Sequence, residues 1–257
     1  MRPVLQKQIP HDPLNPKSLP GVQPLDLENW LTPDDAFAGQ MQLRDQLLEQ
    51  KRDQVTMLDS TAMPAAQELL QTVLGLLYPD ETDVVRRADG RQVDLNWEDP
   101  LGTLGRITQQ DFCILEKHGD EHVMTGAVLC FPASWTLAEK FMKPLTGIHV
   151  PVASYDDGIA ARVQRMFNGV QVGRPLWRYN SLWYQDPTLH QPRSQFEPRD
   201  KTDLSNADYM RSEKQVILRL PETRAVVFSI HTIIVARSDV LAQWGDEGLL
   251  AQTTPEL

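Results

Sequence analysis

Histidine is the residue type best suited to bind a metal or move a proton near neutral pH. The chain has six, at positions 11, 118, 122, 149, 190 and 231. His149 has the most unusual setting, because it stands between two short apolar runs in LTGIHVPVASYDDG, after Gly147 and before Pro151. A break of this kind often presents a side chain into a pocket at a fixed angle. His149 is therefore a candidate ligand, although the residues alone also allow a packed interior histidine.

His231 is the competing histidine. It lies on a predicted strand, where alternation places Val227, Ser229 and Ile233 on the same face. A single imidazole among such neighbours is more typical of a hydrogen-bonded interior group than of a ligand. Both roles stay open, with the interior role favoured.

The other four histidines give weaker signals. His118 and His122 flank the turn of a predicted hairpin, where we expect both to be solvated. Their spacing suits zinc, but a charged hairpin turn supports such a site only weakly. His11 belongs to the N-terminal segment, and His190 belongs to a polar loop.

Charged residues form a second group near the C-terminus. Arg211, Glu213, Gln215 and Ile217 alternate onto one face of a predicted strand, with Arg219 on the same strand. If that face is interior, its charges need partners. A bound anionic cofactor or a cationic substrate would supply them. A solvated Arg–Glu pair is the alternative interpretation.

Several local signatures are absent from the sequence. It contains no GxGxxG, GxxxxGK[ST], GxSxG, HExxH or CxxC motif, so no dinucleotide, nucleoside triphosphate or structural zinc site is recognisable locally. Its two cysteines, Cys113 and Cys130, are too few for an iron–sulfur cluster with four thiolate ligands. We expect both to be small core residues on neighbouring strands.

Composition indicates an ordinary globular protein. The 257 residues are 41% hydrophobic and 23% charged, enough for one large domain or two small ones. The net charge of −10 argues against broad binding to nucleic acid. No apolar run approaches the roughly 18 residues needed to span a membrane, and the N-terminus lacks the apolar core of a secretory signal. We therefore expect a cytoplasmic protein without membrane association.

Prolines and helical periodicity organise the first third of the chain. Residues 1–28 carry six prolines, which predict an extended N-terminal arm. A helix is expected next, with Thr32 as its N-cap, Pro33 at the first helical position, and Asp34 and Asp35 in the first turn. A second, more deeply packed helix follows over PAAQELLQTVLGLLYP and ends at Pro79.

Period-two alternation dominates the rest of the chain. It predicts a hairpin over DFCILEK and HVMTGAVLCF, a strand over LWRYNSLWYQ, and two strands over RSEKQVILRLPETRAVVFSIHTIIVAR. A short helix capped by Ser134 and a helix over DDGIAARVQRMFNGV lie between them, and residues 186–208 form a long loop or lid. The whole predicts an α+β fold, with about five antiparallel strands and helices covering a ligand site.

Two segments resemble the haem-dependent oxidative N-demethylase family. IHVPV after FPASWTLAEKFMKPL is similar to a family pattern FPSxWxxxEKxGxPLxxIHxPVP, and RSEKQVILRLPETRAVVFSIHT is similar to RxERQxLxRLPxTxAVVFxI. The likeness extends to NWL…LRDQLL, AAQELL and QQDFCIL, so it covers most of the chain. Two ordered motifs at the expected separation make the resemblance fairly specific.

The resemblance implies a single domain over residues 29–257 with a Per-Arnt-Sim-like (PAS-like) fold that holds haem b. It also implies monooxygenase chemistry: a small secondary amine such as dimethylamine is converted with O₂ to the primary amine and formaldehyde. Electrons would come from NADPH through an external reductase with flavin and a 2Fe–2S cluster, and a homodimer is a further candidate assembly. His149 matches the family histidine and would be the axial iron ligand, with His231 as the competitor for a cofactor contact. Glu213 would be the counter-ion of the alkylammonium, with Asn180 and Arg211 as polar contacts to the pocket or to the haem propionates.

Two departures from the family patterns fall near these residues. Arg178-Tyr179-Asn180-Ser181 stands where the family usually has Arg-x-Asn-Trp, and Ala153 replaces the second proline of IHxPVP. An altered pocket follows as one expectation. The alternative functions are a haem-binding PAS-like sensor or carrier without turnover, and a structural subunit whose pocket has degenerated.

Overall fold

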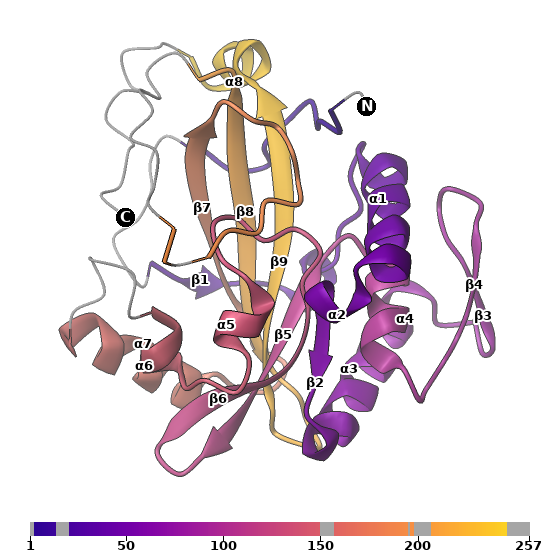
Figure 1. The fold of residues 1–257 in the computed structure, drawn as a ribbon, viewed down its shortest axis with the longest axis vertical. Helices are drawn as coiled ribbons and strands as arrows, with labels where there is room; N and C mark the ends of the chain where they lie inside the picture. Colours follow the sequence, from indigo (N-terminus) through magenta and orange to yellow (C-terminus); the bar gives the residue numbers. More distant parts are fainter. Residues whose placement is uncertain (1–2, 14–20, 150–156, 195, 198–206, 246–257) are drawn as a thin grey trace.

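The computed structural model describes residues 3–13, 21–149, 157–194, 196–197 and 207–245, with only the backbone at 149, 157, 159 and 160. Within these ranges the chain is a mixed α/β fold built on an antiparallel seven-stranded sheet (Figure 1). The strands follow the order β1-β7-β8-β9-β5-β6-β2. Their bounds are β1 Gln23–Pro24, β7 Leu176–Tyr184, β8 Tyr209–Arg219, β9 Val226–Ala236, β5 Asp111–His118, β6 Glu121–Val128 and β2 Thr56–Leu58.

The expected α+β class and its antiparallel sheet are confirmed, but the sheet has more strands than the expected five. The two additional strands, β1 and β2, are only two and three residues long and lie at the edges. Such short strands carry too little alternation to be recognised in a sequence. A separate hairpin of β3 Val84–Arg86 and β4 Gln92–Asp94 lies outside the main sheet.

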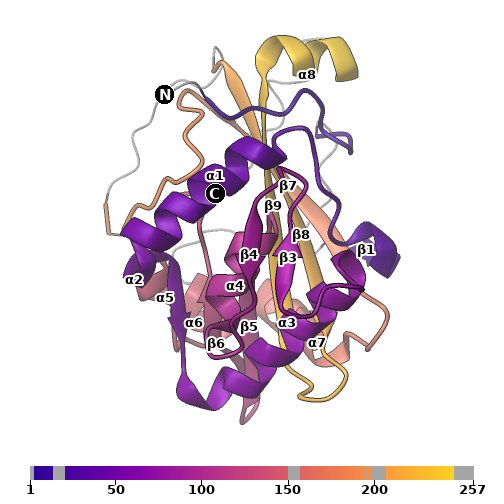
Figure 2. The same ribbon diagram turned by 90° about the vertical axis from the view of Figure 1, so that its right-hand side faces the viewer.

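Helices pack on both faces of the main sheet (Figures 1 and 2). One face is covered by α1 Phe37–Gln50, α3 Met63–Leu77 and α4 Pro100–Ile107, which share a core with Phe112 and Val216. The other face is covered by α5 Leu137–Lys140, α6 Leu145–His149 and α7 Asp157–Gly169, which share a core with Ile217 and Ile230. Successive strand residues point to opposite faces, so the same strands serve both cores.

The remaining helical segments are short. They are α2 Arg52–Val55, α8 Arg237–Trp244 and the 3₁₀ turns η1 Leu27–Asn29 and η2 Ser60–Ala62. In the part of the chain that the structure describes, no helix is long and apolar enough to cross a membrane. The N-terminal segment runs beside β9, because Gln6 N donates to Ile234 O and Gln6 Oε1 accepts from Ile234 N, each at 2.9 Å.

Two of the predicted helix starts are wrong. Helix α1 begins at Phe37 rather than just after Thr32, so Pro33 is not its first residue. Asp34 lies before the helix, where its Oδ1 accepts from Ala36 N at 2.9 Å. Ser134 is also not a cap, since α5 begins after Thr136 and Ser134 has a positive φ of 65°. The local capping signals were outweighed by tertiary contacts of these residues.

Candidate functional site

A row of polar side chains crosses three strands on the sheet face that α5–α7 cover. Asn180 on β7 pairs with Glu213 on β8, and Glu213 pairs with Thr232 on β9. Residues directly opposite one another in a sheet share a face. These three side chains therefore point to the same side as Ile217 and Ile230, which pack against the helices.

Arg211 is an interior residue of this face rather than a solvated one. It is 2% exposed, and its guanidinium donates to Phe131 O at 2.6 Å, Leu189 O at 3.1 Å and Glu213 Oε1 at 3.3 Å. Two of these acceptors are main-chain carbonyls of loops that lie over the end of the sheet. Arg211 thus fastens those loops to β8, and its three nitrogens are already hydrogen-bonded.

Glu213 and its two neighbours retain unused hydrogen-bonding capacity. The Glu213 side chain is 15% exposed, and its second oxygen accepts from Gln215 Nε2 at 3.3 Å. Asn180 is half-buried, and among the described residues its side chain has no hydrogen-bond partner. Thr232 is 1% exposed, and its hydroxyl also lacks a partner within the described ranges. A buried unpaired hydroxyl costs about 1–3 kcal/mol, so a polar ligand bound beside it would stabilise it.

Arg178 is the cation that the sequence predictions overlooked. It pairs across the ladder with Gln215, one step along from Glu213, and its Nη1 donates to Gln215 Oε1 at 3.1 Å. No described carboxylate lies within ion-pair distance of its guanidinium. Burial lowers the pKa of Arg178, and the charge of Glu213 only partly opposes that shift. A half-buried guanidinium without an anionic partner is suited to bind an anionic group.

His149 is the last residue of α6, and its side chain lies outside the described part. The helix that carries it is well fixed: Leu145 packs in the core shared with Ile217, and Thr146 Oγ1 donates to Glu121 Oε1 at 2.7 Å. Lys140 Nζ donates to the carbonyl of Ile148. Helix α6 therefore lies on the same side of the sheet as the polar row. The structure brings Asn180, Glu213 and Arg211 together and places the His149 backbone on their side.

His231 lies on the opposite face of β9. It is 5% exposed, Gln110 Nε2 donates to its Nδ1 at 2.8 Å, and its Nε2 lies 2.8 Å from Asp34 Oδ2. Burial raises the pKa of Asp34, but the hydrogen bond and charge of His231 and bonds from Gln109 and Gln6 outweigh it and lower the pKa. Both ring nitrogens are thus hydrogen-bonded, which is the interior role that the strand pattern favoured.

The burial predicted from the sequence is correct for His118 and for the two cysteines but not for His122. His118 is exposed as expected, whereas the prediction that His122 is solvated is wrong. His122 is 1% exposed and its Nδ1 lies 3.1 Å from Gln164 Nε2 on α7. Cys113 and Cys130 are free and buried, as predicted, but only Cys113 lies on a strand, because β6 ends at Val128. Among the described residues, no three histidine, cysteine or carboxylate side chains are grouped to hold a metal.

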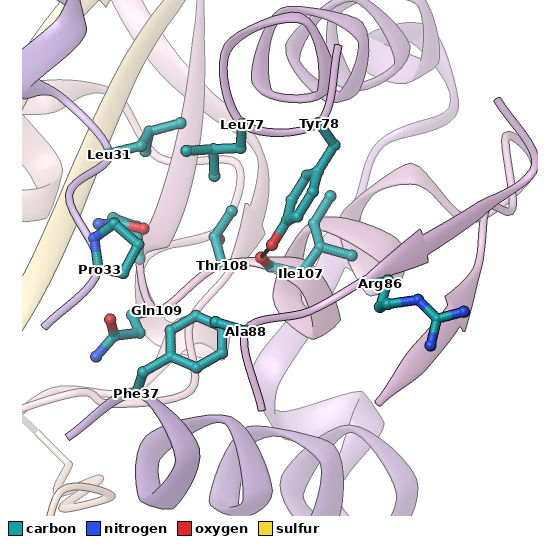
Figure 3. Close-up of a pocket in the computed structure, with 11 residues that line it drawn as sticks. Leu31, Pro33, Phe37, Leu77, Tyr78, Arg86, Ala88, Ile107, Thr108 and Gln109 are labelled. Atoms are coloured by element: carbon teal, nitrogen blue, oxygen red, sulfur yellow. Dashed lines mark hydrogen bonds between the residues drawn. The ribbon is translucent and has the colours of Figure 1, made fainter. Parts of the chain in front are cut away.

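A cavity of about 340 Å³ lies on the His231 side of the sheet, between the start of α1 and the end of α3 (Figure 3). Its wall is largely apolar, and Arg86 points away from it toward the outside. Its lining residues are Leu31, Pro33, Phe37, Leu77, Tyr78, Arg86, Ala88, Ile107, Thr108, Gln109 and Gln110. None of the predicted site residues lines it. We therefore place the candidate site at the polar row, where Asn180 and Thr232 lack side-chain partners among the described residues and Glu213 keeps acceptor capacity.

The fold and the polar row define an α+β protein with polar groups held inside one helix-covered face of its sheet. The family model described as haem-dependent oxidative N-demethylase, alpha subunit-like, matches residues 21–254. The chain therefore belongs to this family, and the resemblance seen in its motifs is confirmed. Membership implies haem dependence and oxidative, N-demethylase-type chemistry, and the designation alpha subunit implies assembly with other subunits.

Proposed function

We propose that this chain is the haem-binding subunit of a monooxygenase that removes a methyl group from a small secondary amine of the dimethylamine type. The observation that carries the proposal is the polar row Asn180–Glu213–Thr232, which lies on the same side of the sheet as the His149 helix. The order of the five long strands, β6-β5-β9-β8-β7, with α5–α7 between β6 and β7, supports a PAS-like domain.

The residues present fit haem b. An imidazole at the end of α6 is a suitable axial ligand, and His149 is our choice because both nitrogens of His231 are hydrogen-bonded. The half-buried Arg178 is a suitable partner for a haem propionate. We assign the propionate contact to Arg178 rather than to Arg211, since the Arg211 donors already serve Phe131, Leu189 and Glu213.

The same face can bind a small alkylammonium ion. The Glu213 carboxylate keeps acceptor capacity, because its two hydrogen bonds are both long at 3.3 Å. Asn180 and Thr232 lie on either side of it and can hydrogen-bond to the amine or to a polar intermediate. The apolar neighbours Ile217 and Ile230 favour methyl groups over larger polar substituents.

Haem, when bound, would supply the activation of O₂. The overall reaction balances as amine N–CH₃ plus O₂, two electrons and two protons giving amine N–H, formaldehyde and water. In our proposal Glu213 holds the ammonium group, and Asn180 and Thr232 orient the carbinolamine that forms when the methyl C–H bond becomes C–OH. That carbinolamine loses formaldehyde when its C–N bond breaks and the nitrogen gains a proton.

The electrons must come from another protein, because the sequence has no dinucleotide motif and too few cysteines for an iron–sulfur cluster. We propose an NADPH-dependent reductase with flavin and 2Fe–2S. The haem-loaded chain, NADPH, O₂ and dimethylamine should release formaldehyde only when such a reductase is added. Peroxide in place of reductase and NADPH would test the haem site separately.

Two outcomes would contradict this function. Sustained NADPH-driven turnover by the isolated chain would refute the need for a reductase. Haem binding without formaldehyde release from any of a broad panel of amines, with either reductase or peroxide, would favour a sensor or carrier. A chain that binds neither haem nor amine would point to the degenerate structural subunit.

A further inference from the structure

Lys140, the last residue of α5, is buried although it carries a charge. The residue is 5% exposed, and its Nζ donates to the carbonyl of Ile148 in α6. Lysine is almost never buried unless its ammonium is hydrogen-bonded or paired. The contact joins two short helices that are separated by only a few residues of chain, so it fixes α6 against α5.

The carbonyl that Lys140 binds is at a special place in α6. It belongs to the last turn of a five-residue helix, where main-chain carbonyls lack donors from within the helix. Pro151 follows three residues later and has no N–H to offer. Because a peptide unit is planar, the Ile148 C=O and the His149 N–H lie in one rigid plane. A donor that fixes this carbonyl also fixes the plane from which His149 starts.

Strand β6 is hydrogen-bonded to the segment that links α5 and α6. Met124 N donates to Lys143 O at 3.1 Å, and Met142 N donates to Met124 O at 2.9 Å. The link between the two helices is therefore hydrogen-bonded to the sheet at Met142 and at Lys143. Thr146 adds a side-chain bond to Glu121, the first residue of β6. The segment between Lys140 and Ile148 is thus attached to one strand at three points.

We infer that Lys140 is the positioning residue for His149: its ammonium holds the Ile148–His149 peptide plane and keeps a positive charge at the Ile148 carbonyl, one residue before the proposed axial ligand. This inference rests on the proposed function, in which His149 binds the haem iron. A fixed positive charge at that place favours the reduced iron, which carries one positive charge fewer. Lys140 therefore acts on both the retention of haem and the ease of its reduction.

The test compares four variants: Lys140→Met, Lys140→Gln, Lys140→Arg and, as a matched control, Lys143→Met. Lys143 is three residues away and carries the same charge, but its side chain makes no contact with the Ile148 carbonyl. Circular dichroism and thermal unfolding of each apoprotein check that it folds. Haem dissociation to a scavenger, the Soret spectrum and the midpoint potential are then measured on the reconstituted proteins.

We expect haem to dissociate roughly 10–100-fold faster from Lys140→Met, the range seen when a partner of a metal ligand is lost. Lys140→Gln keeps an N–H donor but no charge, so it should restore the dissociation rate and leave the potential lowered. Lys140→Arg should restore both, and Lys143→Met should stay within about twofold of wild type in rate. Values for Lys140→Met equal to those of Lys143→Met would overturn the inference.

A measurement on the apoprotein separates this inference from the proposed function. The amide ¹⁵N–¹H resonance of His149 should shift, and its hydrogen exchange should accelerate, in Lys140→Met but not in Lys143→Met. If Lys140→Met shows this effect but the wild-type chain binds no haem, the proposed function and the ligand role of His149 are both refuted. A chain that binds haem through His149 while the amide is unaffected would refute the role of Lys140 alone.

Discussion

The Nε2 atom of His231 lies 2.8 Å from Oδ2 of Asp34, on the sheet face opposite the one that carries Glu213. This hydrogen-bonded pair gives His231 a structural role and leaves His149 as the candidate iron ligand. His231 belongs to a buried network that joins β9 to the segment before α1, whereas the His149 helix packs on the opposite face, the one that carries the polar row. The roles of the two histidines can therefore be separated by substitution.

His231→Asn should destabilise the protein and leave haem binding intact. It removes the partner of Asp34 and of Gln110, and we expect a loss of about 2–3 kcal/mol in the free energy of unfolding. Urea unfolding of the apoprotein measures that loss, and the Soret band measures haem. A folded His231→Asn protein without a Soret band would transfer the ligand role to His231.

The lowered pKa of Asp34 gives this pair a pH dependence. A carboxyl group whose pKa is depressed in the folded state contributes stability that is present above its unfolded pKa, about 3.9, and lost as pH falls through the folded value. Asp34→Asn should therefore cost stability at neutral pH, and its difference from wild type should shrink below about pH 4. A difference that stays constant well below pH 4 would contradict the assignment.

Replacing each of the two arginines near the polar row by methionine should change the stability of the apoprotein by very different amounts. Arg211→Met leaves two carbonyls and the Glu213 carboxylate without their donor, so we expect it to lower the stability of the apoprotein by about 3–5 kcal/mol. Arg178→Met removes a half-buried cation with one hydrogen bond, so apoprotein stability should change by less than about 1 kcal/mol.

For haem affinity, by contrast, we expect Arg178 to be the important arginine. Arg178→Met should bind haem more weakly, with Arg178→Lys intermediate because an ammonium is a poorer match to a carboxylate than a guanidinium. Haem titrations of the two Arg178 variants at a temperature where both are folded measure this. Unchanged affinity in Arg178→Met would contradict the propionate contact.

His11 should make the docking of the N-terminal segment sensitive to acid. Its ring stacks on Tyr179 at 4.2 Å and its Nε2 lies 2.8 Å from Ser212 Oγ, while its buried Nδ1 has no partner in the described structure. Burial, then the charge of Lys214, lowers the pKa of His11 from 6.5 to about 4, against a smaller opposing effect of Asp12. The folded state therefore disfavours a protonated His11.

The sign follows from this shift. The unfolded chain takes up a proton below pH 6.5 and the folded chain does not until about pH 4, so stability falls as pH drops through this window. Between pH 7.5 and 5, His11→Phe should lose about 1–2 kcal/mol less than wild type. His122 contributes to the acid sensitivity of both proteins in the same window, because its pKa is also lowered to about 4. The control is His118→Phe, which replaces an exposed histidine and should lose as much stability as wild type. Equal losses in wild type and His11→Phe would refute the role of His11.

The long strands and the β5–β6 hairpin were predictable, because each carries several residues of period-two alternation. The placement of single polar residues was not. Asp34 has the features of a residue in a helical first turn, yet it pairs with His231, 197 positions later. His122 flanks a turn but is covered by α7, which the hairpin sequence does not reveal.

The candidate site was predictable in part. Alternation on β8 put Arg211 and Glu213 on one face, and the structure confirms that shared face. The alternation did not reveal that the Arg211 guanidinium is hydrogen-bonded to main-chain carbonyls of distant loops. Nor did it reveal that Arg178 lacks an anionic partner within the described part. Those facts depend on tertiary contacts, and the one available signal was the position of Arg178 two residues before Asn180 on the same strand.

The central claim is that this chain holds haem through His149, and a haem titration of wild type and His149→Ala tests it most directly. We predict that wild type binds one haem per chain with a Soret band typical of a histidine ligand. His149→Ala should lose that band or bind haem at least about tenfold more weakly, while its circular dichroism and thermal unfolding stay those of the wild-type apoprotein. A wild-type chain with no Soret band, or a His149→Ala protein with an unchanged one, would contradict the account.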